Sequence, residues 1–197
     1  MKIGIIADTH GNLEGWQQAW ELLQDSDLIF HCGDLLYHGP RFVPAPCYSP
    51  RALAEAFNAC PVPLIFVKGN GDSEVDALFV QAPIQAPYAF AQVEGLRLLA
   101  THGHLEPFEK SLEQAQQWNL DYLLTAHLHV PHVQRHGKLT HINPGTVTYP
   151  LSPDERLARK TCAAIIDGEV TVWDIESQTP LISPWSCCNS EAAQPGY

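Results

Sequence analysis

The chain opens with Met1-Lys2-Ile3-Gly4-Ile5-Ile6-Ala7-Asp8-Thr9-His10-Gly11-Asn12, an apolar run that stops at a carboxylate and, two positions later, an imidazole. Residues 3–7 are nearly all apolar and barely alternate, which is typical of a strand buried on both faces of a sheet. Asp8 and His10 then stand where two metal ligands would follow a strand end. Taken alone, the pattern fits equally well a turn whose Asp and His are ordinary turn formers.

Four further apolar segments also end in polar side chains. Strands are expected near residues 28–32, 63–67, 96–101 and 122–125, and the residues that follow them are Asp34, Asn70, His102, and the pair His127 and His129. In an open α/β sheet the loops after the strands gather along one edge, where ligands bind. Carboxylates, an amide and imidazoles without a thiolate suit Mn²⁺, Fe or Zn²⁺ better than a tetrahedral structural zinc. Seven such ligands could let one shared carboxylate bridge two ions about 3.5–4 Å apart.

The remaining periodicity predicts one α/β domain over residues 1–176. Helices are expected at 14–24, 51–60 and around 112–118, and further strands at 88–93, 133–135, 138–142, 161–166 and 170–175. His31, inside the second strand, is expected to be a packed, hydrogen-bonded histidine. From residue 177 the periodicity disappears, so residues 177–197 are expected to form a mobile tail.

Composition narrows the functional classes. The formal charge of −11, without a lysine or arginine stripe, argues against nonspecific binding to nucleic acid. No stretch approaches the roughly 18 apolar residues of a membrane span, and no signal peptide is visible. Six cysteines without a CxxC pair favour reduced thiols in a cytoplasmic protein. The adjacent Cys187 and Cys188 are interpreted as incidental, with a redox role as the alternative.

Residues 37–50 contain four prolines and are incompatible with a regular helix or a central strand. A loop of this length inside a domain is usually functional or disordered. Because it follows Asp34, we expect it to overhang the strand ends, with His38 and Arg41 best placed to contact an anion. A solvated surface loop is an equally good interpretation.

Six motifs, in this order, resemble those of the calcineurin-like metallophosphoesterases. They are Asp8-Thr9-His10, Gly33-Asp34, Gly69-Asn70-Gly71-Asp72, Thr101-His102-Gly103-His104, Ala126-His127-Leu128-His129 and Asn143-Pro144-Gly145-Thr146. Their spacing, together with the loop at residues 37–41, is especially similar to that of the small YfcE-type phosphodiesterases. The resemblance implies a four-layer α/β/β/α sandwich, in which two packed mixed sheets are flanked by helices.

The same resemblance implies a site with two divalent metal ions. Mn²⁺ is the favoured ion, with Fe, Ni or Zn²⁺ as alternatives. One ion would be held by Asp8, His10, Asp34 and His129, and the other by Asp34, Asn70, His102 and His127. A metal-bound hydroxide would attack the phosphorus of a small phosphodiester in line. Arg41 and Asn70 would contact the substrate. Two divalent ions against two aspartates leave a local charge of about +2, which explains how an acidic protein could accept phosphate.

One departure from the family pattern bears on the substrate. Gly71 stands where the monoesterase branches have a histidine that can protonate the leaving group, so diesters should be preferred to monoesters. His104, His38 or Asp72 could replace that acid. The rival hypotheses are a catalytically silent scaffold for protein binding, a phosphomonoesterase and a nuclease, and a homo-oligomer is compatible with the sequence.

Overall fold

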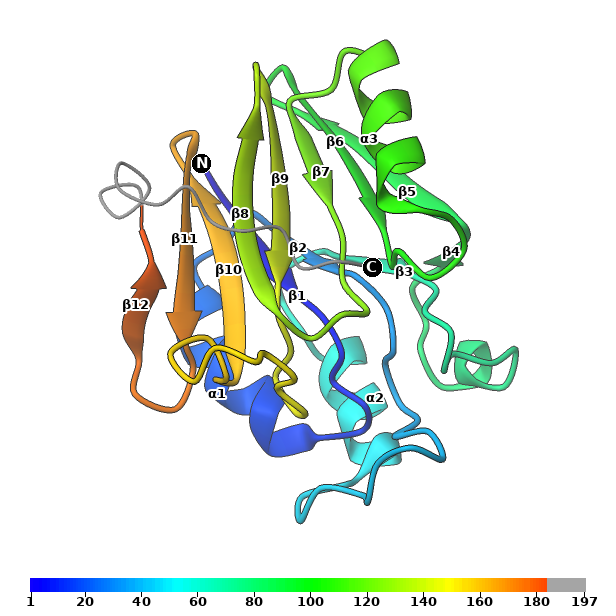
Figure 1. Cartoon of the computed structure of the whole chain (residues 1–197). Helices are drawn as coiled ribbons and strands as arrows, with labels where there is room; N and C mark the ends of the chain where they lie inside the picture. The colour runs from blue at the N-terminus through cyan, green and yellow to red at the C-terminus, as the bar shows by residue number, and fades with distance from the viewer. Residues whose placement is uncertain (184–197) are drawn as a thin grey trace.

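Two mixed β-sheets pack face to face in the computed structural model, which describes residues 1–183 (Figure 1). Within these residues the first sheet has seven strands in the order β12-β11-β10-β1-β2-β3-β4, and β1 to β4 run parallel. Their bounds are β1 (Lys2–Ile6), β2 (Leu28–His31), β3 (Leu64–Val67), β4 (Ile84–Gln85), β10 (Thr161–Ile166), β11 (Glu169–Asp174) and β12 (Thr179–Ile182). The second sheet has the order β5-β6-β7-β9-β8. It consists of β5 (Tyr88–Val93), β6 (Leu96–Thr101), β7 (Tyr122–Leu124), β8 (Pro131–His136) and β9 (Leu139–Pro144).

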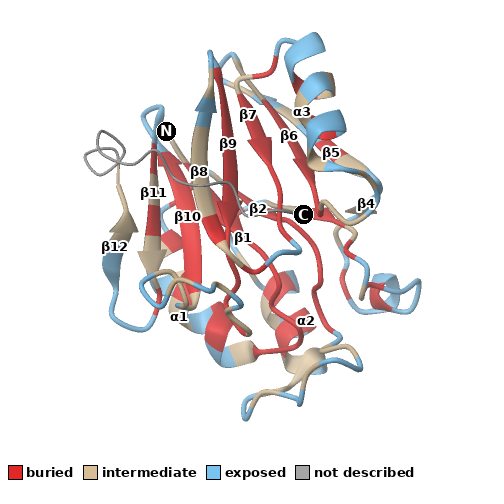
Figure 2. Ribbon diagram, viewed as in Figure 1, coloured by how far each residue is buried: buried red, intermediate tan, exposed pale blue. Residues whose placement is uncertain are grey.

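Helices cover the outer faces of both sheets, so the predicted four-layer α/β/β/α sandwich is confirmed. Helices α1 (Leu13–Leu23) and α2 (Pro50–Asn58) pack on the first sheet, and α3 (Phe108–Gln117) packs on the second (Figure 1). A short 3₁₀ helix, η1 (Asp76–Leu78), precedes β4. The hydrophobic side chains accordingly form three cores, one between the sheets and one under each helical layer. Buried residues run along central strands of both sheets, such as β1 and β9 (Figure 2).

Strand β1 shows why the opening stretch of the sequence is apolar on both faces. Ile3 and Ile5 point into the core between the sheets, whereas Ile6 points into the core beneath α1 and α2. Gly4 also faces the helices, where an added Cβ would lie 2.9 Å from Ile29 Cγ1. Helix α1 begins after the turn at residues 7–12, where the side chain of Asn12 caps it by accepting a hydrogen bond from the Gly15 N–H at 3.1 Å.

The structure confirms most of the predicted elements and corrects the end of the domain. The expected strands at 88–93, 96–101 and 161–166 match the observed bounds. His31 is buried as expected, with Nε2 2.9 Å from Thr9 Oγ1. The prediction of a mobile tail from residue 177 is wrong for its first part, because β12 pairs with β11 and extends the sheet. This short strand could not be predicted from the sequence, because two of its four residues are exposed and buried and exposed positions do not alternate along it. Residues 184–197, including Cys187 and Cys188, lie outside the described part of the chain.

Two observations bear on the classes expected from composition. All four cysteines within residues 1–183 are free thiols: Cys32, Cys47, Cys60 and Cys162. Over the same residues, every helix is too short or too polar to span a membrane.

His141, on β9, makes the stability of the fold sensitive to acid. The side chain is buried, its Nε2 lies 2.7 Å from Thr125 Oγ1, and burial lowers its pKa to about 3. An unfolded histidine has a pKa of about 6.5, so below that pH the unfolded chain binds a proton that the folded chain does not. Folding stability is therefore retained above pH 6.5 and is lost as the pH falls from 6.5 towards 3.

We predict that this residue alone lowers the free energy of unfolding by up to about 1.4 kcal/mol per pH unit below 6.5. Replacement His141→Gln should flatten the dependence by close to one proton, measured by urea unfolding of metal-free protein between pH 7 and pH 5. The substitution Lys138→Gln, in the exposed turn between β8 and β9, is the control and should leave the slope unchanged. Equal slopes for wild type and His141→Gln would contradict the assignment.

Candidate metal centre

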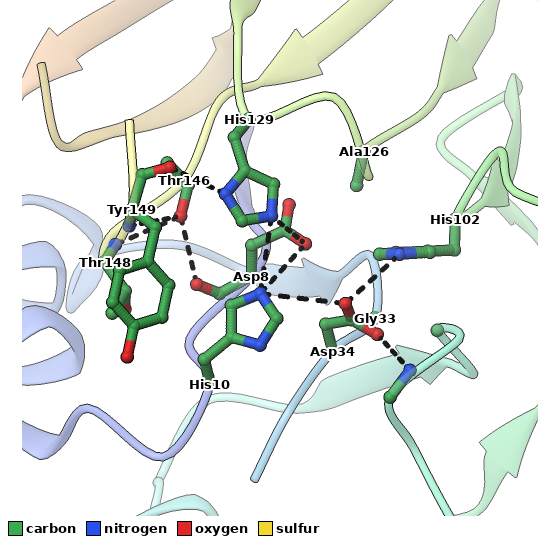
Figure 3. A network of polar contacts seen from close by, with 12 residues as sticks. Asp8, His10, Gly33, Asp34, His102, Ala126, His129, Thr146, Thr148 and Tyr149 are labelled. Carbon is green, nitrogen blue, oxygen red and sulfur yellow. Dashed lines mark hydrogen bonds and ion pairs between the residues drawn. The ribbon is translucent and has the colours of Figure 1, made fainter. Parts of the chain in front are cut away.

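Strand ends from both sheets meet at one edge of the sandwich and bring the predicted ligands together (Figure 3). Asp8 and His10 follow β1, and Asp34 follows β2. The strand pairing continues past the strands, since the Asp8 N–H donates to the Gly33 carbonyl and the His10 N–H donates to the Asp34 carbonyl, both at 3.0 Å. These bonds fix the two segments next to each other before any side chain is considered.

The side-chain atoms converge closely. His129 Nε2 lies 3.3 Å from both Asp8 Oδ1 and His10 Nε2. Asp34 Oδ2 lies 3.6 Å from His10 Nε2 and 3.6 Å from His102 Nε2. Within residues 1–183, two groups are compact enough to hold a metal ion: one made by Asp8, His10 and His129, and the other by Asp8, Asp34 and His102.

Backbone carbonyls orient three of the imidazoles. His10 Nδ1 lies 2.7 Å from the Tyr37 carbonyl, and His129 Nδ1 lies 2.7 Å from the Tyr149 carbonyl. His102 Nδ1 lies 2.8 Å from the carbonyl of Cys32. Because a carbonyl only accepts, each Nδ1 must carry the hydrogen. In the neutral rings Nε2 is therefore a lone pair that faces the centre, which is the tautomer a metal ligand requires.

Asp8 is the strongest indication that a cation belongs here. Its carboxylate is fully buried, and neither oxygen has a hydrogen-bond partner among the described residues. The neutral His129 Nε2 next to Asp8 Oδ1 has no hydrogen to donate, so this contact joins two acceptors. Burying an unpaired carboxylate is costly, and buried polar groups are normally satisfied. A positive ion between these acceptors would remove the cost, so the residues fit a metal.

The Gly69-Asn70-Gly71-Asp72 turn wraps around Asp34. The Gly71 N–H donates to Asp34 Oδ1 at 2.7 Å, which leaves Oδ2 facing the histidines. Asp72 accepts from the N–H groups of Asp34, Leu35 and Gly69 at 2.9, 2.7 and 2.7 Å. Gly69 is needed for this close approach, since an added Cβ would lie 2.1 Å from Asp34 Oδ1. Asp72 thus fixes the backbone that carries Asp34.

The pKa shifts reflect a negatively charged pocket. Burial opposes ionisation of Asp34, but its contacts with His102 hold the pKa of Asp34 well below the usual value. Burial would lower the pKa of His102, yet Asp34 and Asp8 outweigh it and raise the pKa to about 9. Burial likewise opposes charging of His129, but Asp8 raises its pKa. In His10 burial dominates and lowers the pKa. Without metal, the carboxylates therefore draw protons onto neighbouring imidazoles.

The other two predicted ligands and His104 lie on the open side of the centre. Asn70 Oδ1 is 3.1 Å from His102 Nε2, and the ring of His127 is centred 5.1 Å from that of His102. Both Asn70 and His127 are exposed, in contrast to the buried ligands. His104 lies beside them, with its ring 5.2 Å from His102 and 6.0 Å from His127. All seven predicted ligands are thus brought to one place.

Backbone strain is concentrated in this centre. Five of the seven predicted ligands have positive φ angles, between 45° and 69°: Asp8, His10, Asp34, His127 and His129. The other non-glycine residues with positive φ among residues 1–183 include Glu94 and Asp167, which form tight hairpin turns with a following glycine. A non-glycine residue in this region costs about 1 kcal/mol or more, and such strain is typical of functional sites.

The Asn143-Pro144-Gly145-Thr146 motif bonds to the backbone of the turn after β1 and not to the ligand side chains. Thr146 donates from Oγ1 to the Asp8 carbonyl at 3.1 Å (Figure 3). Thr148 Oγ1 donates to the Thr9 carbonyl at 2.8 Å. These contacts clamp the strained turn after β1. The motif is therefore a support for the ligands and supplies none itself.

Two aromatic residues that sequence reasoning missed line the centre. Phe42 stacks on Tyr149 with ring centroids 4.2 Å apart and an interplanar angle of 7°, and it lies 5.6 Å from the His129 ring and 5.8 Å from the His10 ring. Nothing in the Pro-rich loop marks Phe42 as different from the other aromatics around it. Tyr149 could have been suspected from its place three residues after Thr146, next to a family motif.

His38 and Arg41, the two loop residues expected to contact an anion, lie in different surroundings. His38 packs within the loop, between the rings of Tyr37 and Tyr48 at 5.0 and 4.9 Å, and not beside the ligands. Arg41 is exposed, and its guanidinium lies 5.5 Å from the centre of the Phe42 ring. Arg41 is thus next to a residue that contacts the ligand histidines.

Comparison with known proteins places this arrangement in a family. A family model described as the calcineurin-like phosphoesterase superfamily domain matches residues 1–168. Phosphodiesterase YfcE of Escherichia coli (strain K12) is 38% identical over 152 residues, or 76% of this chain and 81% of that protein. Phosphodiesterase MJ0936 of Methanocaldococcus jannaschii is 27% identical over 154 residues, or 74% and 83%.

Solved structures agree. The phosphoesterase Yfce from E. coli superposes with a TM-score of 0.79 at 30% identity, over 92% of this chain and 97% of that one. Vacuolar protein sorting 29 from Cryptosporidium parvum shares the fold, with a TM-score of 0.66 at 19% identity over 91% and 93%. The matched motifs, the two-sheet sandwich and the candidate metal centre have one explanation: this chain belongs to the calcineurin-like phosphoesterase superfamily.

Proposed function

We propose that this chain is a metal-dependent phosphodiesterase that hydrolyses a small phosphodiester with two divalent metal ions. Mn²⁺ is the ion we favour, and Fe, Ni or Zn²⁺ are the alternatives. The observation that carries the proposal is the buried Asp8 carboxylate without a hydrogen-bond partner among the described residues, facing imidazole lone pairs. The YfcE and MJ0936 relatives, both named phosphodiesterases, support the same activity.

The ligand assignment follows the distances around Asp34. Its Oδ2 is equally far from His10 and His102, and Oδ1 is occupied by the Gly71 N–H, so Oδ2 is the atom suited to bridge two ions. One ion would be held by Asp8, His10, Asp34 and His129, and the other by Asp34, Asn70, His102 and His127. Bound ions of this kind lower the pKa of water and neutralise charge on the phosphate.

The protein groups around the ions would position and select the substrate. Asn70 and His127 are exposed and border the open side, where a phosphate group would enter. Arg41, exposed above Phe42, is the one cationic side chain we assign to substrate binding. Because the chain carries a net charge of −11, the attraction for an anionic ester must come from the ions and from such a local cation.

The contacts of His104, His38 and Asp72 support different roles for these three candidates for the general acid. Asp72 is one of the three residues that the sequence offers, but both of its oxygens accept hydrogen bonds from backbone N–H groups around Asp34. We therefore assign Asp72 to positioning. His38 packs inside the loop, so His104, whose ring lies beside those of His102 and His127, is the remaining candidate next to the ligands.

A silent scaffold is the main rival, since vacuolar protein sorting 29 shows that proteins of this fold include members named for a trafficking role. This chain retains all seven ligand positions in one place, which favours an enzyme. A metal centre of this kind could also serve a phosphomonoesterase or a nuclease, and the choice of substrate separates these activities from a phosphodiesterase. We also propose a cytoplasmic location, which the four free cysteines support.

The first prediction concerns metal dependence and substrate class. Metal-free protein should not hydrolyse bis-(p-nitrophenyl) phosphate, Mn²⁺ should restore turnover, and the diester should turn over faster than p-nitrophenyl phosphate. The substitution Asp34→Asn should lower diester turnover by about a hundredfold or more, because it removes the bridging charge. The exposed Asp25→Asn is the matched control and should behave as wild type. Metal binding without any turnover would favour the scaffold, and cleavage of nucleic acid would favour the nuclease.

The second prediction concerns Asp72. An amide has one acceptor oxygen, so Asp72→Asn would turn an NH₂ group towards a backbone N–H and should cost about 1–3 kcal/mol of stability. Because Asp34 would lose its fixed backbone, the dissociation constant for Mn²⁺ should also rise.

Asp76→Ala is the control for that loss, because it leaves the Ser73 N–H without its acceptor. Asp76 is buried and accepts from the Ser73 N–H at 2.7 Å, but it does not contact Asp34. This variant should lose stability and keep its Mn²⁺ affinity, as measured by calorimetry. If both variants bound Mn²⁺ like the wild type, Asp72 would have no positioning role.

The third prediction concerns Gly71. An added Cβ would lie 3.2 Å from Asp34 Oδ1, which a shift of the carboxylate by a few tenths of an ångström would relieve, and Gly71 is not among the residues with positive φ. Gly71→His should therefore fold, and it should raise the ratio of monoester to diester turnover by at least about tenfold by supplying a proton donor. Gly71→Ala controls for the steric change and should leave the ratio unaltered. An unchanged ratio in Gly71→His would exclude the missing histidine as the cause of diester preference.

A further inference from the structure

The loop at residues 37–50 supplies part of the surroundings of the metal ligands. The Tyr37 carbonyl, at the start of the loop, accepts from His10 Nδ1 at 2.7 Å. Phe42, further along, contacts the rings of His10 and His129. The position of this loop therefore affects both histidines on the Asp8 side of the centre.

Tyr149 contacts both this loop and His129. Its carbonyl accepts from His129 Nδ1 at 2.7 Å, and its ring stacks on Phe42. Its hydroxyl accepts from the Ala45 N–H at 3.1 Å and donates to the Val43 carbonyl at 2.9 Å. One residue thus orients a ligand through its backbone and holds the loop through its side chain.

The middle of the loop, around Arg41 and Val43, is exposed. Val43 is 83% exposed and Arg41 is exposed as well. The backbone bonds that anchor the loop to the start of α1 lie in its second half, from the Ser49 N–H to the Gly11 carbonyl at 2.7 Å and from the Leu13 N–H to the Cys47 carbonyl at 3.3 Å. Contacts of Tyr149 with Phe42, Val43 and Ala45 therefore add to the packing of His38 on Tyr48 in holding residues 37–45 over the centre.

We propose that Tyr149 and Phe42 are positioning residues that couple closure of the 37–50 loop to metal binding at the Asp8, His10 and His129 side of the centre. This inference rests on the proposed function in that it requires metal binding there. A closed loop holds His10 and His129 in the ligating orientation, and a bound ion in turn holds the two imidazoles that the loop contacts. Such coupling is reciprocal: each event favours the other by the same factor.

Arg41 allows loop closure to be measured without any activity assay. Trypsin cleavage after Arg41 gives fragments 1–41 and 42–197, which mass spectrometry identifies. For full-length wild type we expect cleavage at Arg41 to slow by about tenfold when Mn²⁺ is added to metal-free protein. Cleavage after Lys138, in the turn at the opposite end of the second sheet, should not respond to Mn²⁺ and serves as the internal control (Figure 1).

Two variants test the coupling. Tyr149→Phe keeps the ring but removes both hydroxyl hydrogen bonds, so it should raise the Mn²⁺ dissociation constant by about tenfold, the size of effect usual for groups that orient metal ligands. It should also weaken protection of Arg41 by Mn²⁺. Phe42→Leu removes the stack independently and should act in the same direction.

Tyr122→Phe is the matched control, because its hydroxyl donates to the Gly168 carbonyl at 3.0 Å far from the loop. It should alter neither Mn²⁺ affinity nor cleavage at Arg41.

The outcomes separate this inference from the proposed function. If wild type binds Mn²⁺ and hydrolyses diesters, but Mn²⁺ does not protect Arg41 and both variants bind it with wild-type affinity, the coupling is overturned and the function stands. If wild type binds no metal, both are overturned. If Tyr149→Phe fails to fold, Phe42→Leu and the wild-type protection experiment still decide the question.

Discussion

The buried carboxylate of Asp8 imposes the constraint on which the rest of the centre depends. Both oxygens are buried and have no hydrogen-bond partner in the described part of the chain. The neighbouring Nε2 atoms of His10 and His129 have no hydrogen to offer in the neutral rings, because Nδ1 carries it. Such a group is stable only beside positive charge, supplied either by protons on His102 and His129 or by metal. Protons and metal therefore compete for one pocket, and the backbone carbonyls determine which nitrogen of each ring meets it.

The sandwich makes this arrangement possible because its two sheets deliver their strand ends to the same edge. Asp8 and Asp34 come from the first sheet, while His102 and His129 follow strands of the second. The positive φ angles of Asp8, Asp34 and His129 turn the chain sharply there, so these side chains face the centre where an extended backbone would direct them elsewhere. The strain is offset by a rigid surrounding, in which Asp72 and Thr146 bond to the backbone next to Asp34 and Asp8.

Much of this could be predicted from the sequence, because the signals are local. Ile3, Ile5 and Ile6 indicate a strand buried on both faces, and ligand types placed just past successive strands indicate a shared edge. The resemblance then implied the two-sheet sandwich, which is confirmed. Other features depend on contacts between distant residues and leave no local pattern: β12 exists because β11 offers an edge, and the orientation of His10 depends on the carbonyl of Tyr37. From the sequence, Asp72 is a candidate general acid, yet in the structure its carboxylate accepts hydrogen bonds from three backbone N–H groups.

The different exposure of the ligands suggests how one rigid scaffold can both retain ions and exchange substrate. Asp8, His10, Asp34, His102 and His129 are buried, and most are fixed by a second hydrogen bond, so their geometry costs little further entropy when an ion binds. Asn70 and His127 are exposed and border the side from which a phosphate can approach. Phe42 and Tyr149 form an aromatic stack, and their rings lie beside the rings of His10 and His129. For the proposed function, the low dielectric of the buried side would strengthen the attraction between a metal ion and these residues, and the open side would admit the substrate.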